Sequence, residues 1–160
     1  MSKPPHKPTH IQPETRPQRQ GKDQHLAAAI TPAKLDWSKQ STPVSNQFDD
    51  IYFSTQDGLE ETQYVFLEHN QLAHRWHQLR DTAGSTFTIA ETGFGTGLNF
   101  LAVCAAWQQQ KLKNARLHFI SVEKFPLTKS DLAKALQPWP SLQSYASQLI
   151  DNYPPLVQGY

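Results

Sequence analysis

The chain has 160 residues, of which 38% are hydrophobic and 18% are charged, so it is long enough to bury one modest core. Its formal net charge of +1 gives no argument for nucleic-acid binding through bulk charge. No apolar run reaches the roughly 18 residues that a membrane-spanning helix needs, and the N-terminus lacks the apolar segment of a secretory signal. The single cysteine, Cys104, excludes an internal disulfide. We therefore expect a cytoplasmic protein.

The first 33 residues differ in composition from the rest of the chain. They are rich in Pro, His, Gln, Lys and Arg, and almost no apolar residue precedes Leu26. Such a segment buries too little surface to offset the entropy lost on ordering. We expect residues 1–33 to form a disordered tail and residues 34–160 to form the folded part. Two interpretations of the tail stay open: a solvated extension without a role, or a weak arm that tethers RNA.

Short β-prone and aromatic runs come next. Leu35–Trp37 and Asp50–Ser54 are expected to be extended, and Thr42–Gln47 between them is expected to be a loop. Asp57 follows and is expected to cap a helix, with Glu60 completing a capping box.

That helix carries a stripe of apolar residues at helical spacing, which is expected to face the core: Val65, Leu72, Trp76 and Leu79. We expect His69 and Asn70 to interrupt it and to divide it into two shorter helices. The histidines of this segment have no second cluster of ligands beside them, so they are expected on the surface and no metal site is predicted: His69, His74 and His77.

The most informative stretch runs from Phe87 to Trp107. A β-prone run, Phe87–Ala90, leads into Glu91 and three glycines, and an apolar helix-compatible run, Leu98–Trp107, follows. Strand, glycine turn and helix in this order are the entrance to a nucleotide-type site in a doubly wound α/β fold. Glycines allow positive φ and let a ligand lie against bare main chain, and the helix N-terminus directs unpaired N–H groups at that ligand.

The spacing of the glycines discriminates between ligands. A dinucleotide fingerprint needs a third glycine where Leu98 stands, and a P-loop needs Gly-Lys-Ser/Thr after the turn, which is absent. The remaining pattern, Glu91-x-Gly93-x-Gly95-x-Gly97, is typical of S-adenosylmethionine (SAM) methyltransferases. SAM has a charged amine that a carboxylate can hold, and it has no pyrophosphate that would require a lysine.

A second carboxylate, Glu123, ends the next predicted strand, Leu117–Val122, where ribose hydroxyls are bound in such folds. Tyr52 and Phe53 are weighed as residues that close over the cofactor, with core packing as the favoured alternative. The predicted SAM contacts are Glu91, Gly93, Phe94, Gly95, Thr96, Gly97, Asn99 and Glu123.

The C-terminal part is expected to be helical. Thr128 and Asp131 are expected to cap one helix, and Ser141 to cap another with an apolar face made of Leu142, Tyr145 and Leu149. No third or fourth strand follows, so the sequence looks cut in mid-domain. A two-stranded parallel sheet is expected neither to cover both of its faces nor to complete a cleft.

Four stretches, in order, resemble one family: Pro43–Ser54, Gly58–Leu67, Glu91–Leu101 and Leu117–Thr128. They are similar to the N-terminal methyltransferase domain of the MnmC family, bifunctional enzymes that finish 5-methylaminomethyl-2-thiouridine at the tRNA wobble position. The similarity runs from about Leu35 to the end of the chain and implies the N-terminal part of a Rossmann-like SAM-dependent methyltransferase fold.

The resemblance implies SAM-dependent methylation of the 5-aminomethyl group of wobble uridine 34, with the anticodon region of tRNA as substrate. In the family, a C-terminal FAD-dependent oxidoreductase domain first exposes that amine. This sequence has no second glycine fingerprint to which FAD could be assigned. It also ends before the family's acidic, aromatic segment beside the amine, so the catalytic residues stay unassigned.

Two alternatives from other classes stay open. A nicotinamide- or flavin-dependent oxidoreductase domain is disfavoured by Leu98 in place of the third glycine. A non-catalytic, RNA-binding remnant is favoured by the stop at Tyr160 and by the basic tail.

Overall fold

The computed structural model describes residues 30–37, 43–45, 50–52, 57–79 and 84–156. Residues 1–29 and Phe53 lie outside these ranges, so the disordered tail and the role of Phe53 stay predictions. In the described part, Ala33 donates its N–H to the carbonyl oxygen of Pro126 at 3.1 Å. The chain forms a mixed α/β structure with two small sheets, which confirms the predicted α/β class.

The first sheet has three short antiparallel strands in the order β1 (Leu35–Asp36), β2 (Val44–Ser45) and β3 (Asp50–Ile51). The predicted loop over Thr42–Gln47 is therefore wrong at β2. Both residues of β2 are buried, and they pair with β1 on one side and β3 on the other. Local turn residues indicated a loop, but the two flanking runs supply hydrogen-bond partners that only the fold brings together.

A helical segment comes next. It begins with α1 (Gly58–Glu61), continues as the π-helical η1 (Thr62–Glu68) and resumes, after a turn, as α2 (Leu72–His77). The predicted division into two helices is confirmed, and Gln71 in the turn has a left-handed φ of 51°. Asp57 is the N-cap residue, but its side chain makes no capping hydrogen bond, so the predicted capping box does not form.

The predicted apolar stripe is only partly buried. Leu72 and Trp76 are buried in the core, whereas Val65 is 51% exposed. Val65 lies in η1, whose wider turn advances more residues than an α-helix and so moves it away from the line of the stripe. The three histidines of the segment are exposed, as predicted.

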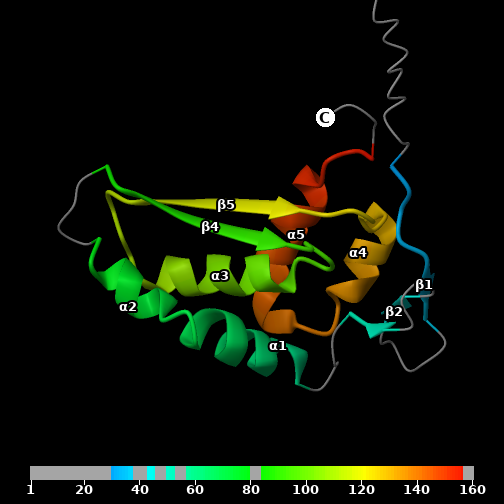
Figure 1. Ribbon diagram of the computed structural model, residues 1–160, viewed down its shortest axis with the longest axis horizontal. Coiled ribbons are helices and arrows are strands. Elements are labelled where there is room, and N and C mark those ends of the chain that lie inside the picture. The colour runs from blue at the N-terminus through cyan, green and yellow to red at the C-terminus, as the bar shows by residue number, and fades with distance from the viewer. Residues whose placement is uncertain (1–29, 38–42, 46–49, 53–56, 80–83, 157–160) are drawn as a thin grey trace, which may run out of the picture.

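The second sheet consists of β4 (Thr86–Thr92) and β5 (Arg116–Val122), which run parallel and in register, with Glu91 opposite Ser121. The glycine turn and α3 (Leu98–Gln109) connect them (Figure 1). The predicted order of strand, glycine turn, helix and strand is confirmed. Because parallel strands end at the same edge, the residues that follow β4 and β5 lie together.

The C-terminal part contains α4 (Lys129–Ala135), the 3₁₀ turn η2 (Pro140–Leu142) and α5 (Gln143–Asn152). Thr128 caps α4 as predicted, since its Oγ1 accepts the N–H of Asp131 at 3.1 Å. Ser141 does not cap the last helix, because Pro140 opens a 3₁₀ turn and α5 begins after Leu142. The predicted apolar face of this segment does pack into the core.

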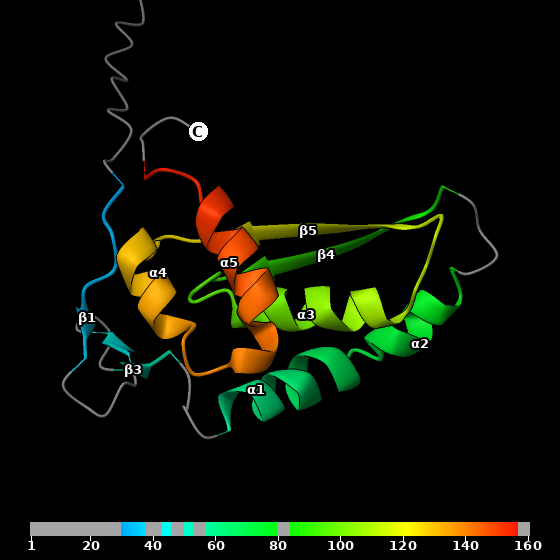
Figure 2. The same ribbon diagram turned by 180° about the vertical axis from the view of Figure 1, so that it is seen from behind.

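Two hydrophobic clusters meet at α3. Val103 joins Ile89, Leu72 and Trp76 beneath the sheet, whereas Leu98 and Leu101 pack with α4 and α5. Figures 1 and 2 show α3 along one face of the β4–β5 sheet and no helix of the described chain over the other. The expectation that the two-stranded sheet is not covered on both of its faces is confirmed for the described residues. Within the described residues, every helix is too short or too polar to cross a membrane.

Candidate functional site

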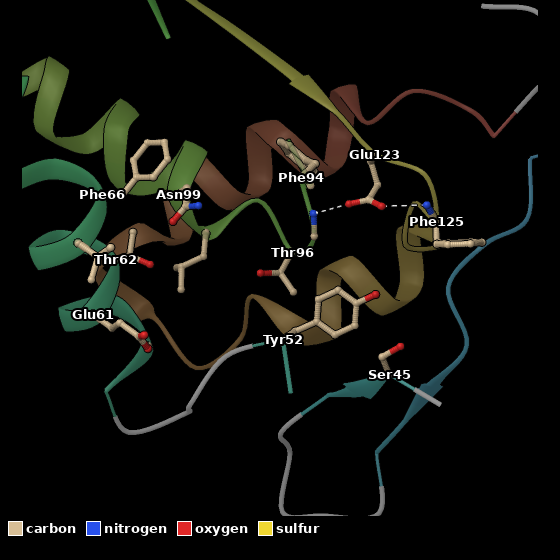
Figure 3. A pocket seen from close by; sticks show the side chains of 15 residues that line it. Ser45, Tyr52, Glu61, Thr62, Phe66, Phe94, Thr96, Asn99, Glu123 and Phe125 are labelled. Atoms are coloured by element: carbon tan, nitrogen blue, oxygen red, sulfur yellow. Dashed lines mark hydrogen bonds between the residues drawn. The ribbon is translucent and has the colours of Figure 1, made fainter. Parts of the chain in front are cut away.

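A cavity of about 540 Å³ lies at the carboxyl edge of the sheet (Figure 3). Figure 3 shows Glu61, Thr62 and Phe66 of α1–η1 on one side of the cavity and Tyr52, Ser45 and Phe125 on the other, with the glycine turn and Glu123 also in the lining. The two-stranded sheet does not line this cavity by itself, because the first sheet and α1–η1 supply much of the lining; the expectation that a half-sheet cannot complete a cleft stays a prediction. The volume is in the range of small-molecule sites.

The glycine turn has the backbone that the sequence predicted. Gly93, Gly95 and Gly97 have φ of 84°, 54° and 73°, values that favour glycine. At Gly97 a Cβ atom would lie 2.7 Å from Cζ of Phe94 and 3.1 Å from Cδ2 of Leu149, so close packing requires glycine there. Gly93 and Gly95 line the cavity, but Gly97 lies behind them, at the N-cap of α3.

Glu123 lies at the end of β5, as predicted, and faces the cavity. Its Oε2 accepts the N–H of Gly95 at 2.9 Å, and its Oε1 accepts the N–H of Phe125 at 2.8 Å (Figure 3). The carboxylate therefore joins the glycine turn to the segment after β5. Each oxygen retains a further lone pair for a ligand hydroxyl.

Glu91 lies near the end of β4 and lines an adjoining second cavity of about 420 Å³. Its Oε1 accepts the hydroxyl of Ser121 at 2.9 Å, and its Oε2 accepts Nδ2 of Asn99 at 3.3 Å. Burial raises the pKa of the Glu91 carboxyl above its ordinary value, the two hydrogen bonds lower it, and the charge of Glu123 raises it further. Asn99 and Phe66 line both cavities, so the two are continuous neighbours.

Phe94, Thr96 and Asn99 are the other predicted contacts, and all three line the first cavity. Thr96 is buried. The ring of Phe94 lies beside those of Phe100 and Tyr153, with centroids 6.1 and 6.3 Å away, so it also packs against the core. The structure thus brings six of the eight predicted residues into one cavity and places Glu91 in its neighbour.

Several lining residues were not predicted from the sequence: Ser45, Gly58, Glu61, Thr62, Val65, Phe66, Leu98 and Phe125. They come mainly from α1–η1, which has no local ligand signature and reaches the site only through packing on α3. Tyr52 was weighed for this place, and it does line the cavity; a Cβ atom on Gly95 would lie 3.5 Å from its ring. Burial, with a smaller contribution from Glu123, raises the pKa of Tyr52.

The lining is acidic and aromatic. Among the described residues, the first cavity is lined by the carboxylates Glu61 and Glu123 and the second by Glu91, and neither is lined by a lysine, arginine or histidine. Tyr52, Phe66 and Phe125 add aromatic rings. Such a lining suits a ligand with positive charge and hydroxyl groups, and it is unsuited to a pyrophosphate. The described residues hold no group of three or more His, Cys, Asp or Glu that could bind a metal.

Comparison with known proteins finds several relatives that share a name. No family model matches the chain. It is 50% identical to the tRNA 5-methylaminomethyl-2-thiouridine biosynthesis bifunctional protein MnmC of Legionella pneumophila, over 83% of this chain and 20% of that protein. The same-named proteins of Pseudomonas fluorescens and Marinobacter nauticus are 52% and 54% identical, over 80% and 82% of this chain and 19% and 21% of theirs.

The chain thus spans about a fifth of the length of the curated relatives it matches. The resemblance to MnmC proteins, predicted from four short stretches, is confirmed over four fifths of the chain.

Proposed function

We propose that this chain, about half identical to MnmC proteins over four fifths of its length, binds SAM and forms part of a tRNA-modifying methyltransferase. The reaction is methylation of the 5-aminomethyl group of wobble uridine 34, on the anticodon region of tRNA in the cytoplasm. The β4–α3–β5 unit is proposed to be the first half of a Rossmann-like, doubly wound sheet. FAD is not proposed for this chain.

The observation that carries the proposal is the acidic lining beside the glycine turn, to which the described residues contribute no lysine. SAM has a sulfonium and an ammonium group, which carboxylates and aromatic rings attract. A nicotinamide or flavin dinucleotide has a pyrophosphate, which three nearby carboxylates repel. The N-terminus of the twelve-residue helix α3 meets the cavity at Leu98 and Asn99, where it suits the carboxylate of SAM's amino-acid end.

The residues of the chain have separate tasks in this proposal. Glu123 accepts ribose hydroxyls, Glu91 holds the ammonium group, and Gly93 and Gly95 let the cofactor lie against main chain. When bound, SAM supplies an electrophilic methyl group for an in-line displacement by a neutral amine. The contribution of this chain is to position the methyl donor and to exclude water from one side of it.

The test is isothermal titration of the 160-residue chain with S-adenosylhomocysteine and, separately, with NADH. We expect heat of binding with the first ligand only. Gly95→Asp is the control: it places a side chain at a φ of 54° beside Tyr52 and a carboxylate next to Glu123. We expect this variant to keep the circular dichroism spectrum and lose the binding.

The other outcomes separate the alternatives. Binding of NADH without S-adenosylhomocysteine would support the oxidoreductase hypothesis. A folded chain that binds neither ligand would support a non-catalytic remnant. If the chain binds S-adenosylhomocysteine, methyl transfer to tRNA that carries 5-aminomethyluridine is the next measurement.

A further inference from the structure

The carboxylate of Glu91 is held by side-chain donors, whereas that of Glu123 is held by main-chain N–H groups. Side chains from two other elements hold it: Ser121 Oγ donates from β5 at 2.9 Å and Asn99 Nδ2 from α3 at 3.3 Å. Ser121 stands directly opposite Glu91 in the parallel register. Both oxygens of the carboxylate are therefore fixed by donors from both sides.

The charge of Glu91 depends on these two donors. Half-burial is the largest influence on its pKa and raises it, and the two hydrogen bonds oppose that rise. The charged groups that face it are acidic: Glu123 acts on it from the end of β5, and Glu61 of α1 lines the adjoining cavity. No lysine, arginine or histidine of the described chain lines either cavity. A ligand cation is thus the partner that this carboxylate fits.

We propose that Ser121 is a positioning residue: its hydroxyl, together with Asn99, orients the Glu91 carboxylate toward the second cavity, where it receives the ammonium group of SAM. This inference rests on the proposed function. It assigns a role to Ser121, which no sequence pattern singled out. It also gives Asn99 an indirect role, because its amide nitrogen is turned toward Glu91.

Ser121→Ala, titrated with two ligands, tests the inference. S-adenosylhomocysteine has the ammonium group, whereas 5′-methylthioadenosine lacks the whole amino-acid end. We expect roughly tenfold weaker binding of S-adenosylhomocysteine, the loss typical of a hydrogen bond to a charged group, and unchanged binding of 5′-methylthioadenosine. Ser121→Thr keeps the hydroxyl, so this variant is expected to bind both ligands as the wild type does.

The pH dependence supplies a readout that a structural role would not move. Removing the Ser121 donor raises the pKa of Glu91 further, so the variant loses S-adenosylhomocysteine binding at a higher pH than the wild type as the pH falls. Thr88→Val is the matched control, since Thr88 is an exposed residue of the same strand as Glu91, lines neither cavity and is not a donor to Glu91. The affinities of this variant for both ligands are expected to stay within about twofold of the wild-type values. Its pH midpoint is expected to stay within about 0.3 units, which corresponds to roughly the same twofold range.

The outcomes separate this inference from the function on which it rests. Equal weakening of both ligands, or an unmoved pH midpoint, would overturn the role of Ser121 while leaving SAM binding intact. A wild-type chain that binds neither ligand would overturn both proposals. If Ser121→Ala loses its circular dichroism signal, Ser121→Cys, which keeps the size but donates weakly, decides by the same two titrations.

Discussion

The two faces of the β4–β5 sheet carry alternate residues of the same strands, yet only one is packed. On the packed face, Phe87, Ile89 and Phe119 lie in a cluster with Trp76 and Val103. On the open face, Ala90, Ile120 and Val122 are exposed. Parallel sheets are normally covered on both faces. The helices on the packed face therefore hold the β4–β5 sheet in place, and helices of this same face also line the cavity.

The largest expected effect is on the packed face. Trp76 is fully buried, and its ring meets those of Phe87 and Trp107 edge-on, with centroids 6.1 and 5.3 Å away. Trp76→Ala is expected to lower the free energy of unfolding by about 3–5 kcal/mol, because it empties the centre of the cluster. Urea denaturation measures the loss.

Trp76→Phe is the matched control. The indole N–H of Trp76 is buried without a hydrogen-bond partner in the described structure, so phenylalanine removes an unsatisfied donor while keeping most of the ring. A loss as large as that of the alanine variant would contradict this expectation and would show that the indole N–H has a hydrogen-bond partner in solution.

The next largest effect is expected at the glycine turn, where two glycines differ in the space available for a side chain. Gly97 and Gly93 both have positive φ, but a Cβ atom at Gly97 meets Phe94 at 2.7 Å, whereas one at Gly93 meets nothing within 4 Å. Gly97→Ala is expected to cost about 3 kcal/mol, from backbone strain and collision together. Gly93→Ala is expected to cost about 1 kcal/mol, from backbone strain alone. Thermal unfolding of the pair checks the difference, and equal losses would contradict it.

The glycine turn also shows which parts of the site the sequence could predict. Glu123, Gly93 and Gly95 lie in the cavity lining, and their positions in the fold follow from local rules: a strand end, a positive φ, a helix start. Glu61 and the strand at Val44 were missed. Their places depend on packing between segments far apart in the chain, and no local spacing encodes that.

The missed hydrogen bond to Glu91 has the same cause. Alternation in β5 predicts that Ser121 and Phe119 share a face, but only the parallel register places Ser121 opposite Glu91. Parallel register is fixed by the packing of α3, not by a turn of defined length. The sequence therefore predicted which residue types lie at this edge of the sheet, but it did not predict which of them form hydrogen bonds with one another.

A pair of valines sharpens the comparison of the faces. Val103 on α3 is completely buried, and Val122 on the open face is 61% exposed. Val103→Ala is expected to lower the free energy of unfolding by about 2 kcal/mol, from lost burial and the cavity left behind. Val122→Ala removes the same atoms from water-exposed surface, so its cost is expected to stay below about 0.5 kcal/mol. Equal costs in urea would mean that Val122 is covered in solution.

The smallest expected effect is that of the double variant Ile120→Thr, Val122→Thr. Threonine keeps the β-branched shape that suits a strand, and both side chains point away from the packed cluster, so the free energy of unfolding is expected to change by less than about 0.5 kcal/mol. Any self-association of the wild type through this apolar face should weaken, because exposed apolar patches drive such contacts. Sedimentation velocity measures the association, and urea denaturation measures the stability. A loss of more than about 1 kcal/mol would contradict the open face directly, since a residue in water contributes little burial to lose.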